Sequence, residues 1–192
     1  MNPGLREAEA AAEGWSAQEL LAWAAREFGA TAALASSFGA EDVALIDITF
    51  RLGAPFPVFT LDTDFLFPET YDLITRIETR YGINIERLRS KLTPEQQARE
   101  FGEALWARQP DRCCSIRKVE PLTDRLKTSS AWITGIRRQQ SPTRANARKL
   151  EWDAKFGLVK LNPLADWSEA QVWDYIRSHQ VAYNPLHDRG YP

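Results

Sequence analysis

Two adjacent cysteines are the residues whose type and spacing most directly indicate chemistry. Cys113 and Cys114 are the only cysteines among the 192 residues, and Arg117 and Lys118 follow them closely. Adjacent cysteines do not match the spacing of a secreted disulfide framework. Thiols that open a helix near basic side chains are favoured as thiolates, which suits metal binding or redox chemistry. The alternative is a buried cysteine beside an inert exposed one.

The segment S-S-F-G-A-E-D, from Ser36 to Asp42, is a second candidate site. It follows a short apolar run and precedes an apolar-periodic segment, so it is expected to leave a strand and enter a helix. Such a loop directs backbone N–H groups at phosphate or sulfate. Gly39 permits close approach, Ser36 and Ser37 add hydroxyl donors, and first-turn acids suit the helix dipole. An ordinary tight turn with a helix cap explains the same residues equally well.

Two later loops extend the candidate site. The segment L-D-T-D-F-L-F-P-E-T-Y begins at the end of the next expected strand, where Leu61 is placed to contact a base and Asp62 to accept a ribose or amino hydrogen bond. An aspartate-rich lead-in to a helix is the alternative. Residues 137–149 carry five positive charges and no acid. Because arginine matches phosphate and sulfate oxygens, these residues predict a local anion site, with a solvated basic surface as the alternative.

Alternating strands and helices are expected to position these loops. Buried strands are predicted at 31–35, 57–62, 83–88 and 131–136. Helices are predicted from a Ser16 cap to Phe28, over 43–50, from about Pro68 to Gly82, from a Thr93 cap to about Trp106, and over 117–126. This order predicts an α/β fold, a mostly parallel sheet between two helical layers, with ligands at the carboxyl ends of the strands.

Composition limits the class of protein. A chain of 192 residues with 44% hydrophobic residues is long enough for one core, so we expect a single domain over 15–192 after a loose lead-in at 1–14. The net charge of −2 argues against a general nucleic-acid binder. No apolar run approaches the length of a membrane span, and the N-terminus is charged, which predicts a cytoplasmic protein without a membrane partner.

Several segments resemble a known family. S-S-F-G-A-E-D-V-A-L-I-D resembles the modified pyrophosphate loop of sulfonucleotide reductases, a branch of the adenine-nucleotide alpha-hydrolase-like fold, which is Rossmann-like. D-R-C-C-S-I-R-K-V-E-P-L and T-G-I-R-R-Q-Q-S-P-T-R resemble segments of assimilatory adenosine 5′-phosphosulfate (APS) reductases. Relatives that use the 3′-phosphorylated substrate (PAPS) generally lack the cysteine pair, so the resemblance favours APS. The family's L-D-T-G segment is matched except at Asp64, where many members have glycine.

The resemblance implies an activity and a set of roles. It implies reduction of APS to sulfite and AMP in sulfate assimilation, with thioredoxin or a similar thiol donor as partner. Lys118 would contact the substrate sulfate, and Cys113 and Cys114 would supply two of the four ligands of a 4Fe-4S cluster. The residues expected to bind the substrate are Ser36, Ser37, Phe38, Gly39, Glu41, Asp42, Leu61, Asp62, Gly135, Arg137 and Arg144.

The number of cysteines conflicts with a complete reductase. A cluster of this type needs four thiolates and the chain has two. In the family, the tail ending at Pro192 continues into a second cysteine pair and then the nucleophilic cysteine, so we expect a truncated enzyme that is inactive alone. Three alternatives stay open: a PAPS reductase, an ATP-pyrophosphatase such as a sulfate adenylyltransferase subunit, and a non-catalytic adenine-nucleotide binding module. The oligomeric state is left open.

Overall fold

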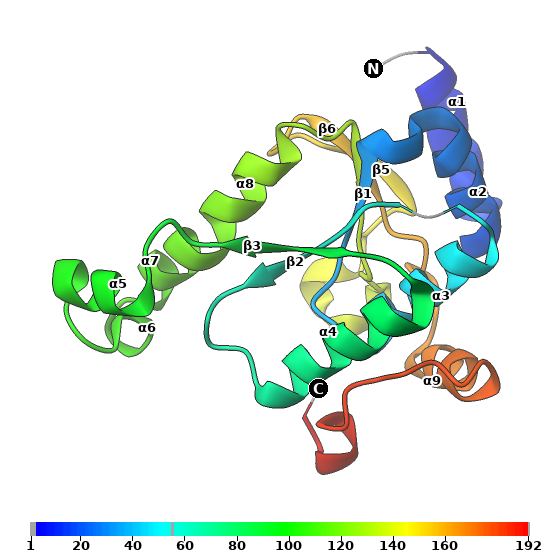
Figure 1. Cartoon of the computed structure of the whole chain (residues 1–192). Helices are drawn as coiled ribbons and strands as arrows, with labels where there is room; N and C mark the ends of the chain where they lie inside the picture. Colours follow the sequence, from blue (N-terminus) through cyan, green and yellow to red (C-terminus); the bar gives the residue numbers. More distant parts are fainter. Residues whose placement is uncertain (1–2, 55, 192) are drawn as a thin grey trace.

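A six-stranded sheet in the order β3-β2-β1-β4-β6-β5 forms the centre of the computed structural model, which describes residues 3–54 and 56–191 (Figure 1). The strands are β1 (Ala32–Ala35), β2 (Val58–Asp62), β3 (Ile85–Arg89), β4 (Ala131–Ile133), β5 (Leu150–Asp153) and β6 (Leu158–Leu161). β1 to β4 and β6 are parallel, and β5 pairs antiparallel with β6. The chain moves from β1 outward to β3 and then returns to β4 on the other side of β1, which creates a topological switch point.

Helices lie on both sides of this sheet. They are α1 (Pro3–Ala11), α2 (Ala17–Phe28), α3 (Ala40–Arg51), α4 (Pro68–Tyr81), α5 (Pro94–Phe101), α6 (Leu105–Arg108), α7 (Pro110–Cys114), α8 (Glu120–Leu126) and α9 (Glu169–Ser178). A π-helical turn, η3 (Ser115–Val119), joins α7 to α8. No helix in the described ranges is both long enough and apolar enough to cross a membrane.

The alternation of side chains along β1 separates two cores. Leu34 packs with residues of α2, α3, α4 and α9 in the larger hydrophobic cluster. Its neighbour Ala33 packs with Phe59 of β2 and with Leu126 of α8 in a second cluster. Because adjacent strand residues point to opposite faces, the two clusters cover opposite faces of the sheet. This arrangement confirms the predicted three-layer α/β fold.

The predicted helix signals at two positions are confirmed. Ser16 caps α2: its hydroxyl accepts the N–H of Glu19, and the Glu19 carboxylate accepts the N–H of Ser16. Gly82 ends α4 in the left-handed conformation, with φ of 63°. A residue without a Cβ adopts this conformation at low cost, which explains why the helix stops there.

The structure differs from the sequence predictions in several elements. Residues 3–11 form α1 and not a loose lead-in, and the Ala12 that follows α1 is fully buried. The helix beginning at Pro94 ends at Phe101, before Trp106, because Gly102 has a φ of 82° and breaks it. The last predicted strand ends at Ile133, three residues early. The hairpin of β5 and β6 lies outside the predicted elements, because each of its strands has only four residues, the lower limit for a recognisable alternating pattern.

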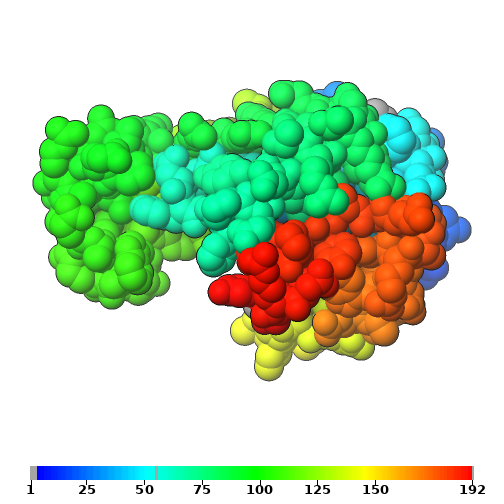
Figure 2. Space-filling view, turned by 60° about the horizontal axis from the view of Figure 1, so that its bottom comes forward, coloured from blue at the N-terminus to red at the C-terminus, as the bar shows by residue number. Residues whose placement is uncertain are grey.

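The helices α5, α6 and α7 form a lobe that projects from one side of the sheet (Figure 1). Leu105, Cys113 and Ile116 make a small core of their own, packed with Leu92 and Phe101. In the space-filling view, a hollow separates this lobe from the C-terminal segment (Figure 2). The cysteine-bearing helix therefore stands at the border between the lobe and the main body.

Asp47 joins three helices on the opposite side of the molecule. Its buried carboxylate, on α3, accepts hydrogen bonds from the hydroxyl of Tyr81 on α4 at 2.8 Å and of Tyr175 on α9 at 2.7 Å, and it pairs with Arg51 at 2.6 Å. Burial opposes ionisation, but these hydrogen bonds outweigh it and lower the pKa of Asp47. The ionised carboxylate thus connects α3, α4 and α9.

Replacing Asp47 is expected to destabilise the fold. Asp47→Ala removes the acceptor of two tyrosine hydroxyls, of buried Tyr81 and half-buried Tyr175, which we expect to lower the free energy of unfolding by about 3 kcal/mol. Asp174→Ala is the control, because Asp174 pairs with Arg177 on the exposed surface of α9 and should change stability by less than about 1 kcal/mol. Urea unfolding measures both, and equal effects would contradict the role of Asp47.

Candidate functional site

A cavity of about 840 Å³ opens at the carboxyl ends of β1, β2 and β4, next to the switch point. Its wall comes from the loops after these strands, from the lobe and from the cysteine-bearing helix. Among the residues expected in the site, it is lined by Ser36, Ser37, Glu41, Asp42, Leu61, Cys113, Cys114, Lys118, Gly135 and Arg144. The structure therefore brings together residues from four segments that are far apart in the sequence.

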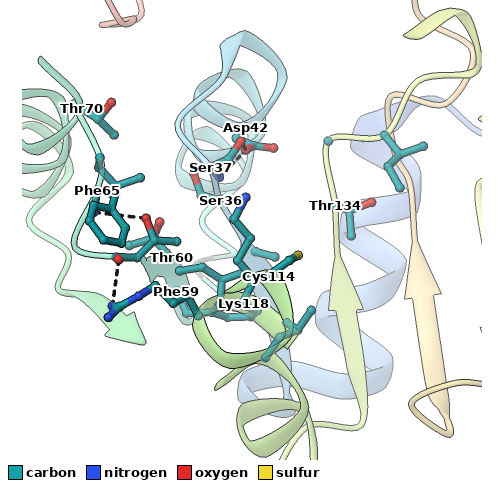
Figure 3. A pocket seen from close by; sticks show the side chains of 18 of the residues that line it. Ser36, Ser37, Asp42, Phe59, Thr60, Phe65, Thr70, Cys114, Lys118 and Thr134 are labelled. Carbon is teal, nitrogen blue, oxygen red and sulfur yellow. Dashed lines mark hydrogen bonds between the residues drawn. The ribbon is translucent and has the colours of Figure 1, made fainter. Parts of the chain in front are cut away.

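The loop after β1 is organised around the carboxylate of Asp42. The backbone N–H of Ser37 donates to it at 2.6 Å, and the Ser37 hydroxyl donates at 2.8 Å (Figure 3). The Ser36 hydroxyl accepts the N–H of Phe38 at 3.1 Å. The N–H groups of Ser37 and Phe38, which were predicted to face an anion, therefore form hydrogen bonds within the loop.

Gly135, after β4, closes against the same carboxylate. The N–H of Gly135 acts to lower the pKa of Asp42. A Cβ added at Gly135 would lie 2.3 Å from Oδ1 of Asp42 and 2.8 Å from Cβ of Glu41. Close approach of the two loops therefore requires glycine at this position, in addition to any contact with a ligand.

The carboxyl group of Asp42 has a raised pKa. Burial raises the pKa of Asp42 to about 6, although the hydrogen bonds from Ser37 act in the opposite direction, and the charge of Glu41 raises it further. A proton on this carboxyl group would change which donors and acceptors the two loops present. The loop that faces the cavity consequently contains a group that titrates near neutral pH.

The cysteine pair and Lys118 approach the cavity from the other side. Cys113 is buried and Cys114 is exposed, and both thiols are free. Cys114 and Lys118 extend from the same helix toward the loop of Ser36 and Ser37 (Figure 3). The ammonium of Lys118 has no hydrogen bond or ion pair within the described part of the chain, so it is available to an anionic ligand.

Arg117 has a different position from the one predicted beside the thiols. Its fully buried guanidinium donates to the Asp64 carboxylate at 2.8 Å, to the Thr63 carbonyl at 3.1 Å and to the Gln97 side chain at 2.9 Å. Its charge is therefore paired with that of Asp64, and the side chain of Gln97 lies between the guanidinium and the thiol of Cys113. It connects the loop after β2 to α5 of the lobe.

Asp64 occupies a backbone position that suits glycine. Its φ is 63°, the left-handed region that residues with a Cβ adopt only at some cost. The N–H of Asp64 donates to Asp62 at 3.1 Å, and the ion pair with Arg117 fixes its side chain. Asp64 thus adopts a left-handed conformation that favours glycine, while its carboxylate pairs with Arg117.

Most of the basic residues in 137–149 are already neutralised. Arg137 pairs with Glu41 at 2.6 Å, Arg138 with Glu13 at 2.5 Å, Arg148 with Glu9 at 2.5 Å and Lys149 with Asp166 at 2.7 Å. Of the five basic residues in 137–149, Arg144 is the exception. In the described part of the chain, it contacts the neutral side chain of Gln140 and no carboxylate. The predicted anion site is therefore reduced to one arginine of the loop.

Four expected binding residues do not line the cavity. Phe38 is a core residue with φ of 63°, and Gly39 caps α3. Asp62 is fully buried and accepts hydrogen bonds from Tyr71 at 2.7 Å and from Arg89 at 2.8 and 2.9 Å. Burial is outweighed by these bonds, which lower the pKa of Asp62. Arg137, in its ion pair, is the fourth.

Other lining residues were missed by the sequence analysis. They are mainly threonine and aromatic residues: Phe59, Thr60, Thr63, Phe65, Phe67, Thr70, Trp106, Trp132, Thr134 and Gln140. Gln140 could have been found, because it lies in the T-G-I-R-R-Q-Q-S segment, and it contacts Glu41 at 3.0 Å and the carbonyl of Gly135 at 3.4 Å. Trp106 offers no such signal, because its approach depends on how the lobe folds.

The two thiols are not part of a complete set of metal ligands in the described part of the chain. Within the described residues, no group of three or more histidine, cysteine, aspartate or glutamate side chains is placed to hold a metal ion. Cys113 and Cys114 can therefore supply at most two ligands, half of what a 4Fe-4S cluster requires.

The contact between Gly135 and Asp42 predicts a steric effect. Gly135→Ala would force the two loops apart, and we expect the free energy of unfolding to fall by about 2 kcal/mol. The control is Gly14→Ala, since a Cβ at Gly14 meets no atom within 4 Å and should have an effect below about 0.5 kcal/mol. Chemical denaturation distinguishes the two variants, and similar stabilities would contradict the close approach.

The raised pKa of Asp42 predicts a pH-dependent effect of Asp42→Asn. Stability contributed by a group with a raised pKa is fully present below its unfolded pKa, near 3.9, and is lost as the pH rises through about 6. Asparagine carries no charge. The free energy of unfolding of Asp42→Asn, relative to that of the native chain, should therefore rise between about pH 4 and pH 7, by up to about 3 kcal/mol.

Asp47→Asn is the matched control for this pH profile. The pKa of Asp47 is lowered, so its stabilising contribution is present above the unfolded pKa and is lost only as the pH falls through the folded pKa. Unfolding free energies should then show no comparable rise for this variant between about pH 4 and pH 7. A flat profile for Asp42→Asn would contradict the burial of an ionisable Asp42.

Comparisons with known proteins agree with this geometry. Residues 31–192 match the model of the phosphoadenosine phosphosulfate reductase domain. The chain is 42% identical over 189 residues to an adenosine 5′-phosphosulfate reductase of Halalkalibacterium halodurans, covering 98% of the chain and 82% of that protein. It resembles the crystal structure of a phosphoadenylyl-sulfate reductase from Candida auris, with a TM-score of 0.88 and 28% identity, over 100% of the chain and 94% of that structure.

A more distant likeness concerns the fold. An NH3-dependent NAD synthetase of Campylobacter jejuni matches with a TM-score of 0.62 and 9% identity, over 100% of the chain and 80% of that structure. This likeness supports the adenine-nucleotide alpha-hydrolase-like fold alone. The match over 31–192 and the identity to reductases over nearly the whole chain show that the chain belongs to the phosphoadenosine phosphosulfate reductase family.

Proposed function

We propose that this chain binds adenosine 5′-phosphosulfate in the cavity at the switch point and takes part in its thiol-dependent reduction to sulfite and AMP, in sulfate assimilation. The observation that carries the proposal is the position of Lys118, whose unpaired ammonium lies beside two free thiols in a cavity at the carboxyl ends of parallel strands. Ligands of open α/β sheets bind at this edge.

The charges on the cavity wall suit a dianionic ligand. Lys118 and Arg144 are the lining lysine and arginine that have no carboxylate partner in the described ranges, whereas Arg117, also lining, is neutralised by Asp64. The phosphate and the sulfate of APS each carry one negative charge. Two unpaired cations would therefore neutralise the phosphosulfate, and an arginine can do so with two parallel hydrogen bonds.

The apolar part of the same wall suits the nucleoside. Leu61 lies near the carboxyl end of β2, Ile136 follows β4, and Phe59 lies two residues before Leu61 in β2. A base has large apolar faces and a few polar edge atoms, which match a wall of this kind with the serine and threonine hydroxyls at its rim. Adenine at the strand ends and phosphosulfate toward Lys118 is the orientation we propose.

The chemistry of the reaction transfers the sulfur of APS to a thiol. A thiolate attacks the sulfur, AMP leaves, and a donor such as thioredoxin then releases sulfite by forming a disulfide with the attacking thiol. The role proposed for this chain is to bind the substrate and to balance the charge of its sulfate with Lys118. We expect the chain to bind the nucleotide in this cavity.

A 4Fe-4S cluster fits the described residues only in part. Cys113 and Cys114 line the cavity and are proposed as two of its ligands, but no third ligand group accompanies them in the described ranges. We expect iron and sulfide analysis of the chain to give values far below four atoms of each per chain, and values near four would contradict this expectation.

Calorimetric titration with APS, AMP, PAPS and ATP tests the proposed function. APS is expected to bind more tightly than AMP, PAPS or ATP. Lys118→Met should weaken APS binding about tenfold, equivalent to about 1.4 kcal/mol, and change AMP binding much less. Lys127→Met is the matched control, because Lys127 follows α8 and pairs with Asp124 on the surface.

The titration also distinguishes the competing functions. A preference for ATP would favour an ATP-pyrophosphatase, and a preference for PAPS would favour a PAPS reductase. Binding of APS that is unchanged by Lys118→Met would contradict the proposed position of the sulfate.

A further inference from the structure

The helix that carries the cysteines and Lys118 contains a π-helical turn. α7 and α8 are joined by η3 (Ser115–Val119), and the N–H of Glu120 donates to the carbonyl of Ser115, five residues earlier. An α-helix would bond each N–H to the fourth residue before it. The helix thus accommodates one extra residue in this turn.

Pro121 explains why the turn widens at this place. Proline has no N–H, and inside an α-helix its ring clashes with the carbonyl four residues earlier, here that of Arg117. A π-helical turn immediately before the proline moves that carbonyl out of register with the ring. Pro121 is the second residue of α8 and directly follows Glu120, whose N–H closes the wide turn.

The wide turn sets the rotation between two anchored ends of the helix. At one end, Cys113 and Ile116 pack in the core of the lobe. At the other, Leu126 is buried in the cluster under the sheet, and Arg125 pairs with Glu86 at 2.6 Å. Neither end can rotate freely about the helix axis, so the number of residues per turn between them decides which side chains face the cavity.

One row of the side chains that face the cavity recurs every four residues. Cys114, Lys118 and Leu122 all line it, and Leu126 continues the row into the cluster under the sheet. In an α-helix, each step of four residues overshoots a full turn by about 40°, so three steps would rotate the row by about 120°. One extra residue absorbs about 100° of that rotation. The π-helical turn therefore keeps Cys114 and Lys118 on the side of the cavity.

We propose that Pro121 is a positioning residue: it enforces the π-helical turn that directs Lys118 and Cys114 into the cavity while α8 stays packed under the sheet. This inference rests on the proposed function for its consequence, that Lys118 meets the sulfate of APS. It does not require Pro121 to contact the substrate, and Pro121 is absent from the residues that line the cavity.

The test compares Pro121→Ala with a matched proline variant. Pro94→Ala is the control, because Pro94 lies in the first turn of α5, where a missing N–H costs nothing and no wide turn depends on it. Calorimetry should show that the ratio of APS affinity to AMP affinity is about tenfold lower in Pro121→Ala than in the native chain. The AMP affinity itself should stay within about twofold of the native value. Pro94→Ala should retain both affinities, and a retained APS preference in Pro121→Ala would overturn the proposal.

A double-mutant cycle shows whether Pro121 acts through Lys118. If it does, Pro121→Ala combined with Lys118→Met should bind APS no more weakly than Lys118→Met alone. Losses that add would mean that Pro121→Ala damages the site in another way, which would overturn the proposal. Thermal unfolding verifies that each variant is folded, and Pro121→Ser, which also restores an N–H, replaces the alanine variant if that variant does not fold.

Hydrogen exchange tests the helix itself, independently of any ligand. In the Pro121→Ala variant, the new N–H at position 121 should donate to the carbonyl of Arg117 and exchange slowly, as in a regular α-helix. Fast exchange at position 121 would show that the wide turn persists without proline and would overturn the proposal. If the native chain binds neither APS nor AMP, the proposed function fails, while this exchange measurement still decides the role of Pro121.

Discussion

The buried carboxylate of Asp42 is the interaction on which the candidate site depends. It accepts hydrogen bonds from Ser37, in the loop after β1, and Gly135, after β4, lies so close that an added Cβ would be 2.3 Å from its Oδ1. These strands are the two neighbours at the switch point, where the crossovers leave in opposite directions and no helix covers the strand ends. Without the contacts of this carboxylate, the two loops would separate, and the cavity would lose part of its wall. The energetic cost is the burial of an ionisable group, which is visible in its raised pKa.

The distribution of ion pairs then explains how an acidic protein provides an anion site. The chain has 24 basic and 26 acidic residues, so a local excess of positive charge requires that some cations have no carboxylate near them. In residues 137–149, pairing with Glu41, Glu13, Glu9 and Asp166 removes all but Arg144. The paired residues fix the backbone of this segment against α1 and α3, and Arg144 is left for a ligand. A count of charges along the sequence cannot make this distinction, because the partners are up to 139 positions away.

Sequence patterns predicted the elements that depend on local chemistry and failed where distant contacts decide. The Ser16 cap, the Gly82 helix end and the loop after β1 are encoded within a few residues, and they are confirmed. Asp62 looked like a free acceptor at a strand end, but Arg89, 27 residues later, occupies it. Arg117 looked like a partner of the thiols because it is close in sequence, yet its guanidinium crosses to Asp64. α1 was missed because its alanine-rich face acquires a partner only when the hairpin of β5 and β6 folds.

Arg117 and Asp64 also determine how the lobe is attached. A buried arginine needs an acceptor for each of its donors, and here they come from the loop after β2, from the carbonyl of Leu92 and from Gln97 on α5. Because burying an unpaired guanidinium is costly, these acceptors have to stay together, which holds the lobe against the main body. Asp64 adopts a left-handed backbone conformation to complete the set. Glycine would adopt that conformation more easily but would leave Arg117 without a carboxylate. The aspartate therefore costs some backbone strain, and its ion pair with Arg117 fixes the position of the cysteine-bearing helix.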